Sequence, residues 1–140
     1  MTVSEATYLD TSVFIYIIEN HVAYSPKLEQ FMEDSLESGA KFFTSTITLA
    51  EFGVQPERLG RHDLIQDFHD FVRDLPIEFN PLNLTAAVHA YGLRAKYASL
   101  RALDALQLGA ALGAGCRVFL TNDFDLKKVS EIQVLLIADL

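Results

Sequence analysis

The sequence predicts an α/β protein in which a mainly parallel sheet is covered on both faces by helices. Short apolar runs, each long enough for one buried strand, alternate with longer segments whose apolar residues recur at helical spacing. Strands that are buried on both faces appear as continuous apolar runs, and the helical crossovers that join parallel strands cover both sides of the sheet. The alternation of the two kinds of segment therefore indicates this fold class.

The expected elements follow from these patterns. We expect strands at residues 7–9, 41–45, 77–79, 118–120 and 134–137. We expect helices from Ser25 to a stop at Gly39, and over residues 46–52, 64–75, 84–95 and 104–112, with a connecting loop at 55–61. Residues 13–18 stay ambiguous, because their β-branched composition favours a strand while the preceding Asp10, Thr11 and Ser12 are helix-capping types.

Composition narrows the class of protein. With 140 residues, half of them apolar, the chain suits one compact domain spanning 1–140. No apolar run is long enough to span a bilayer, and the first residues do not resemble a secretory signal. The single cysteine, Cys116, excludes an internal disulfide and a cysteine-based zinc site. A cytoplasmic protein without membrane association is therefore expected.

The net charge of −8 argues against a general nucleic-acid binder, since phosphate contacts need cationic side chains. The region before Asp104 is locally basic, and Arg94, Lys96 and Arg101 are candidates for RNA phosphate contacts, although a solvated helix face would look the same. An acidic protein can still act on RNA where metal ions supply positive charge, and it can also attract a basic partner.

Four acidic residues stand out by their positions. Asp10 follows the strand at 7–9, and Asp123 follows the strand at 118–120 after two residues. Glu51 lies in the helix after the strand at 41–45, and Asp104 starts an otherwise apolar helix. Taken singly, each could be a helix cap, a turn residue or a surface residue. Together they are expected to meet at the carboxyl edge of the sheet, where ligands of open α/β sheets collect.

Carboxylates that lie close together need a counter-charge. Oxygen ligands favour Mg²⁺ or Mn²⁺, and such an ion can activate water against a phosphodiester. The histidines have no metal-binding spacing and are interpreted as surface or packing residues: His21, His62, His69 and His89.

Four segments carry a resemblance to a known family. LDTSVFIY at 9–16, TITLAEF at 46–52, LDALQLGAA at 103–111 and LTNDFDL at 120–126 resemble, in order, the four acidic motifs of PIN domains. The resemblance extends over essentially the whole chain. It implies a three-layer α/β/α fold with a mainly parallel sheet of four to five short strands, and a Mg²⁺- or Mn²⁺-dependent endoribonuclease specific for single-stranded RNA.

The resemblance also implies roles for individual residues. Asp10, Glu51, Asp104 and Asp123 would be the catalytic, metal-binding quartet, with Thr11 and Thr121 as accessory hydroxyls. Asp125 would be an extra acid or the cap of the turn through Lys127. The family often has an aromatic residue and a histidine where this chain has Leu103 and Gln107. We expect these two departures to affect packing near the site and not metal binding.

The chain is most similar to the toxins of VapC-type toxin–antitoxin pairs. That similarity implies a homodimer inhibited by a small DNA-binding antitoxin. Three alternatives stay open: a PIN nuclease of RNA processing, a non-catalytic PIN scaffold, and a phosphoacceptor receiver domain. The receiver domain is disfavoured, because no acidic pair lies at 7–10 and no aspartate follows the strand at 41–45.

Overall fold

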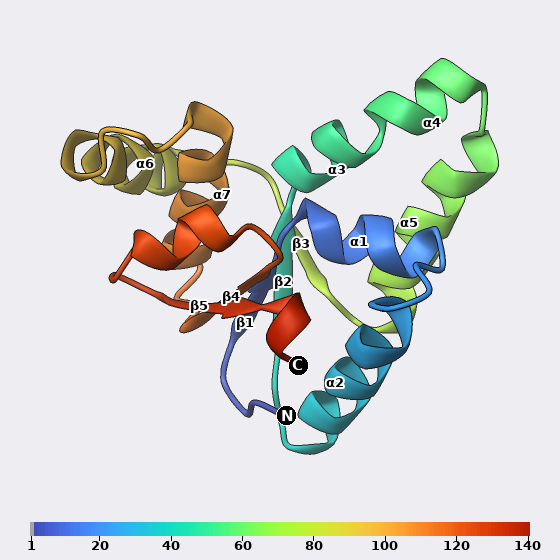
Figure 1. Ribbon diagram of the computed structural model, residues 1–140. Coiled ribbons are helices and arrows are strands. Elements are labelled where there is room, and N and C mark those ends of the chain that lie inside the picture. The colour runs from blue at the N-terminus through green and yellow to red at the C-terminus, as the bar shows by residue number, and fades with distance from the viewer. Residues whose placement is uncertain (1) are drawn as a thin grey trace.

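The computed structural model describes residues 2–140, which form a five-stranded, all-parallel sheet (Figure 1). The strand order is β3-β2-β1-β4-β5. The strands are β1 (Thr7–Leu9), β2 (Phe42–Ser45), β3 (Glu78–Asn80), β4 (Val118–Thr121) and β5 (Gln133–Leu136). The predicted α/β class with a parallel sheet is confirmed, and β1 lies at its centre.

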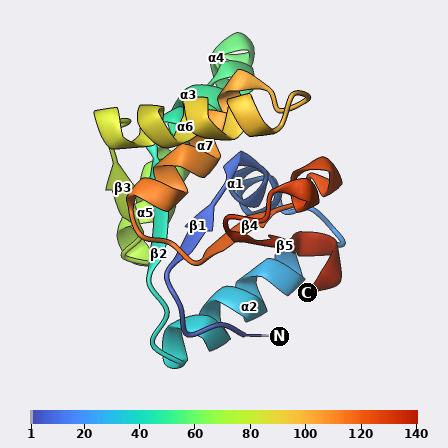
Figure 2. The same cartoon turned by 90° about the vertical axis from the view of Figure 1, so that its left-hand side faces the viewer.

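Helices cover both faces of the sheet, as the two views in Figures 1 and 2 show. One layer contains α1 (Thr11–Ile18), α2 (Ser25–Glu37) and α5 (His62–Asp74), and the other contains α6 (Leu84–Lys96), α7 (Ala102–Gly113) and the 3₁₀ helix η1 (Phe124–Lys128). The remaining helical segments are α3 (Thr46–Phe52), α4 (Val54–Leu59) and the 3₁₀ helix η2 (Ile137–Asp139). No helix among residues 2–140 is both long and apolar enough to cross a bilayer.

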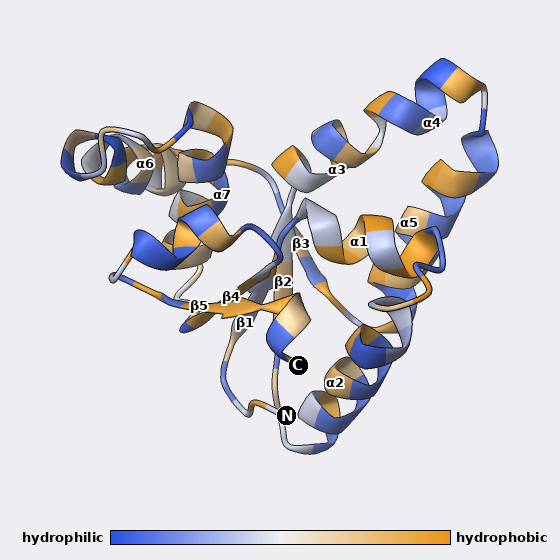
Figure 3. Cartoon of the chain, viewed as in Figure 1, coloured by the Kyte–Doolittle hydropathy of each residue, from blue (hydrophilic) through white to orange (hydrophobic). Residues whose placement is uncertain are grey.

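Alternate residues of the strands supply two separate cores. Tyr8 packs with α6 and α7, and its ring stacks on Phe119 with the centroids 5.4 Å apart. Leu9 and Leu120, the next residue in each strand, face α1, α2 and α5. In Figure 3 the strands β4 and β5 are largely orange, as expected for strands covered on both sides.

The ambiguous run at 13–18 belongs to helix α1. The Asp10 side chain caps this helix, because its Oδ1 accepts a hydrogen bond of 2.7 Å from the Ser12 backbone N–H. The helix then buries Val13 and Phe14 against the core. A local cap and a buried face thus outweigh the strand propensity of the β-branched residues.

The prediction of a connecting loop at 55–61 is wrong. Most of that segment forms α4, which ends at Gly60 in the left-handed conformation with φ of 65°. Pro56 lies in the first turn of α4, where a backbone N–H has no partner within the helix, so the proline does not break it.

The buried face of α6 differs from the one that its sequence pattern predicts, which is the stripe of apolar residues at helical spacing formed by Leu84, Ala87, Val88, Tyr91 and Ala95. Ala86, Ala90 and Leu93 are buried, whereas Leu84 and Tyr91 are 80% and 68% exposed. The cause is close packing of α6 on α7. A Cβ atom added at Gly109 of α7 would collide with the Ala86 carbonyl oxygen, so no side chain fits at this position of α7.

Candidate metal centre

The four predicted carboxylates line one open cavity at the carboxyl edge of the sheet. The cavity has a volume of about 370 Å³. Asp10 follows β1, Glu51 lies on α3, Asp104 lies in the first turn of α7, and Asp123 caps η1. Thr11, Gln107 and Thr121 also line the cavity. Parallel strands that end at the same edge thus bring together side chains up to 113 positions apart, as Asp10 and Asp123 are.

Asp10 is held by neutral donors alone. Its Oδ1 accepts bonds from the Ser12 backbone N–H and from the Ser12 hydroxyl at 2.6 Å, and its Oδ2 accepts the Thr121 hydroxyl at 2.5 Å. Burial raises the pKa of Asp10, the hydroxyl donors oppose that shift, and the negative charge of Glu51 adds to it. A nearby cation would therefore stabilise the ionised carboxylate.

Glu51 is likewise held by neutral groups. Its Oε1 accepts the Thr11 hydroxyl at 2.8 Å and the Gln107 Nε2 at 2.9 Å. Gln107 Nε2 also donates to the Thr11 hydroxyl at 3.0 Å. These bonds fix the position of Glu51 and leave its charge uncompensated.

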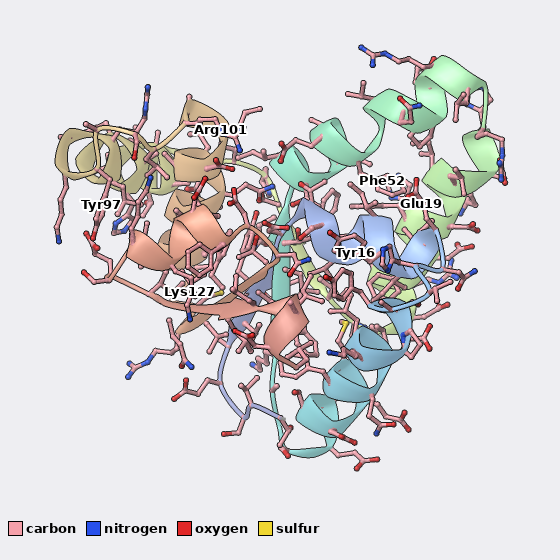
Figure 4. The ribbon with its side chains drawn as sticks, viewed as in Figure 1. Tyr16, Glu19, Phe52, Tyr97, Arg101 and Lys127 are labelled. Atoms are coloured by element: carbon pink, nitrogen blue, oxygen red, sulfur yellow. The ribbon has the colours of Figure 1, made fainter. Side chains whose placement is uncertain are left out.

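Asp104 and Asp123 share a cationic neighbour. The Arg101 guanidinium lies 3.1 Å from Asp104 Oδ2 and 3.7 Å from Asp123 Oδ2. Burial raises the pKa of Asp104, Arg101 opposes the shift, and the charges of Asp123 and Glu51 reinforce it. The Arg101 side chain is 78% exposed, and Figure 4 shows it at the start of α7. An exposed ion pair of this kind contributes little stability, so the arginine can move aside at low cost.

The donor set fits a hard divalent cation. All the candidate ligand atoms are oxygens, the atoms that Mg²⁺ and Mn²⁺ prefer, and Asp10 and Glu51 have only neutral hydrogen-bond donors. As the side chains stand, no three histidine, cysteine or acidic groups within residues 2–140 converge closely enough to hold one ion. Binding would therefore require the carboxylates, above all those paired with Arg101, to reorient.

The other candidate residues occupy different positions. Arg94 Nε donates to the Leu100 carbonyl at 3.3 Å, and Lys96 pairs with Glu131 at 3.4 Å. Among the three cations predicted to contact RNA, Arg101 is the one that pairs with two of the four candidate metal ligands, Asp104 and Asp123. The cap of η1 is Asp123, whose Oδ1 accepts the Asp125 N–H at 3.0 Å, so the capping role considered for Asp125 belongs to Asp123. All four histidines are exposed and lie outside this cavity.

Comparison with known proteins identifies the family. The model of the PIN domain matches residues 7–132. The chain belongs to the PIN domain family. The match covers all four motifs and confirms the resemblance found in the sequence. A search of curated proteins gave no significant match.

Solved structures share this PIN fold at low sequence identity. DNA-bound VapBC from Salmonella typhimurium matches with a TM-score of 0.74 and 21% identity, over 95% of this chain and 98% of that one. VapBC2 from Rickettsia felis, bound to a promoter DNA fragment, matches with a TM-score of 0.73 and 18% identity, over 94% of this chain and 98% of that one. Mycobacterium tuberculosis VapC20, described as a toxin that cleaves the sarcin-ricin loop, matches with a TM-score of 0.68 and 12% identity, over 90% of this chain and 98% of that one. The three-layer PIN fold is thereby confirmed.

Gln107 is the residue of this PIN domain whose contacts the sequence does not reveal. The sequence predicts an effect on packing alone, but the side chain touches both the core and Glu51. Its Oε1 accepts hydrogen bonds from the hydroxyls of Tyr8 and Thr48, the latter at 3.2 Å. Burial raises the pKa of Tyr8 to about 12, so this hydroxyl stays protonated and can donate. The sequence contains one sign of this role: Gln107 is a polar residue inside the apolar stretch of α7, one helical turn after Asp104.

We predict that Gln107→Leu destabilises the protein and displaces Glu51. Leucine has a similar size but removes the acceptor of the buried Thr48 hydroxyl and one of the two partners of the Tyr8 hydroxyl, which keeps its bond of 2.7 Å to Ser45. A buried polar group left unsatisfied costs about 1–3 kcal/mol. Urea unfolding should show this loss. Gln66→Leu on the exposed face of α5 is the matched control and should change the unfolding free energy by less than about 0.5 kcal/mol. Equal stability of the two variants would show that the Gln107 bonds contribute nothing.

Proposed function

We propose that this PIN domain is a Mg²⁺- or Mn²⁺-dependent endoribonuclease that hydrolyses RNA phosphodiesters in the cytoplasm. One observation carries the proposal: four carboxylates from separate segments line a single cavity, and two of them have only neutral partners. The uncompensated charge has no evident structural use, because neutral side chains could make the same hydrogen bonds without the cost of like-charge repulsion.

Asp10, Asp104 and Asp123 would hold the metal ion, with Glu51 as a further ligand or as the acceptor of a bond from its water. When bound, the ion would neutralise these acids, polarise the phosphodiester and favour ionisation of the attacking water. The chain's own residues supply the positioning. Ser12 and Thr121 orient Asp10, while Thr11 and Gln107 orient Glu51.

Arg101 supplies a further function in this proposal. Its guanidinium lies beside Asp104 and Asp123 and is exposed, so an entering phosphate group can reach it. With a metal ion held by the two aspartates, Arg101 would be free to contact phosphate. The net charge of −8 disfavours RNA binding, because RNA phosphates are also negative. Arg101 would offset this repulsion by placing a positive charge beside the bound phosphate.

We further propose that the protein is the toxin of a toxin–antitoxin pair and binds a small DNA-binding antitoxin. Its solved neighbours include such complexes, and a second cavity suits a protein segment. This cavity, of about 540 Å³ between α1, α2 and α5, has an apolar lining of Ile17, Met32, Leu36, Phe71 and Leu75. Glu29, Glu33, Glu37 and Asp74 also line it, so it is complementary to an amphipathic helix with basic residues.

We also propose that the protein is a homodimer, because α6 exposes an apolar face. Leu84, Val88 and Tyr91 are 80%, 45% and 68% exposed and recur at helical spacing, so they form one apolar stripe on the surface. A stripe of this kind on each of two chains can form a self-complementary two-fold interface.

The nuclease proposal predicts metal-dependent cleavage that requires Asp10. Wild-type protein with Mn²⁺ or Mg²⁺ should cut single-stranded RNA, and EDTA should stop the reaction. Because water attacks phosphorus and the ribose 3′ oxygen leaves, the fragments should carry 5′-phosphates. Asp10→Asn should lower the rate at least about 100-fold, because a metal ligand is lost.

The control for Asp10→Asn is Asp67→Asn, at an exposed position of α5 outside the cavity, which should cleave like the wild type. Thermal unfolding in EDTA should show that both variants are folded. Wild-type activity in a folded Asp10→Asn protein would refute the assigned role.

The antitoxin proposal predicts that the product of a short neighbouring gene binds the cavity between α2 and α5. Reversing charge with Glu33→Lys and Glu37→Lys together should weaken binding roughly tenfold or more, since a basic helix would then meet like charges. Titration calorimetry would measure the affinity. Asp67→Lys adds positive charge elsewhere on α5 and should bind normally. Unchanged binding by the double variant would place the partner on another surface, and absence of any such gene would favour an RNA-processing role.

The dimer proposal predicts that Val88→Glu yields a monomer, because a carboxylate in the centre of the stripe would have to be desolvated. Sedimentation velocity would distinguish the two states. Val22→Glu, at a position that is 93% exposed in the loop after α1, should stay dimeric. A wild-type protein that sediments as a monomer would overturn this assembly.

A further inference from the structure

A second open cavity adjoins the one lined by the four carboxylates. It has a volume of about 930 Å³ and is formed by the loop before α7 and by η1. Asp104 and Asp123 line both cavities, so the two lie side by side. A polymer whose reacting phosphate lies at the acids would extend into this space.

Phe124 is the feature of this cavity that ordinary packing does not explain. It follows Asp123 directly, lines the cavity and is 72% exposed. Within residues 2–140 no other aromatic ring stacks on it. A single exposed apolar side chain is common on protein surfaces. This one differs because it lies beside the residues proposed to act on phosphate.

The segment that carries Phe124 is well anchored. Leu126 and Val129 are each 2% exposed and hold η1 on the sheet. Lys128 Nζ donates to the Ser99 hydroxyl at 2.5 Å and ties η1 to the loop before α7. The ring is therefore presented to solvent from a fixed backbone, as an aromatic platform for a ligand requires.

The cavity contains cations that could contact phosphate. Arg101, Lys127 and Lys128 line it together with Asp104, Asp123 and Asp125, so its cationic side chains balance its acids. Lys127 Nζ donates to the Val134 carbonyl at 3.3 Å in a partly buried contact. Lys128 and Arg101 bond to Ser99 and Asp104 in exposed contacts, so these two cations are the better placed to contact phosphate. A flat aromatic ring with neighbouring cations is the combination that binds single-stranded nucleic acid.

We infer that Phe124 forms a stacking subsite for one unpaired base of the RNA substrate, next to the phosphate held at the acids. This inference rests on the proposed nuclease function. Arg101 and Lys128 contact the backbone on either side of that base. A base inside a duplex already stacks on its neighbours, so the subsite selects single-stranded RNA.

The direct test uses the absence of tryptophan from the chain. Phe124→Trp in an Asp10→Asn background gives one fluorescent reporter in a protein that does not cleave. Titration with a single-stranded oligoribonucleotide in Mg²⁺ should quench the emission, and the same sequence as a duplex should not. Val22→Trp in the same background controls for nonspecific contact and should not be quenched. Equal quenching by the two RNA forms, or none, overturns the subsite.

A kinetic experiment separates failure of this inference from failure of the nuclease proposal. In otherwise wild-type protein, Phe124→Ala should raise KM for single-stranded RNA roughly 5- to 100-fold, the range expected for losing one stacked base. Phe124→Tyr should retain a low KM, whereas Phe124→Leu should not. If the wild type cleaves and Phe124→Ala has an unchanged KM, the subsite is wrong and the nuclease stands. If the wild type does not cleave but single-stranded RNA quenches the Phe124→Trp reporter, the subsite stands and the catalytic proposal falls.

Discussion

The hydrogen bonds of Gln107 are the constraint on which the acidic cavity depends. A side-chain amide has an accepting end and a donating end, and the core uses the accepting end. Because Tyr8 and Thr48 donate to Oε1, the NH₂ group must point toward Thr11 and Glu51. The orientation of Glu51 is thus fixed by contacts with β1 and α3. A histidine at this position could become protonated and neutralise Glu51, whereas the amide leaves its charge available for a cation.

The placement of Asp10, Glu51 and Asp123 could be predicted from the sequence, because these residues come after β1, β2 and β4, whereas Asp104 comes after a helix. Strands that run parallel and end at one edge must present the residues that follow them together, whatever the details of packing. Asp10 also shows that a structural and a proposed chemical role need not exclude each other. Its Oδ1 caps α1 and its Oδ2 bonds to Thr121, so one carboxylate orders a helix and still faces the cavity.

What the sequence could not predict depends on close packing and on paired polar groups. The sequence pattern misassigns the exposed face of α6, because it places the largest apolar residues in the helix–helix contact. Gly109 and Ala86 instead bring the two helices so near that a larger side chain is excluded at the point where these two residues meet. The contacts of Gln107 escape prediction for a related reason: a single glutamine in a sequence gives no sign of which hydroxyls it will meet.

Arg101 lines the cavity that contains Phe124 and pairs with the two aspartates that line both cavities, and this position explains how an acidic protein could bind an anionic substrate. Two aspartates that line both cavities would repel each other without a positive group, and the arginine provides one from an exposed, easily displaced side chain. A divalent ion is a stronger counter-charge for the same oxygens. Its arrival would release the guanidinium toward the cavity that contains Phe124, where a phosphate group can replace the carboxylates as its partner. The same acids that repel RNA in the free protein would thereby prepare a site that attracts it.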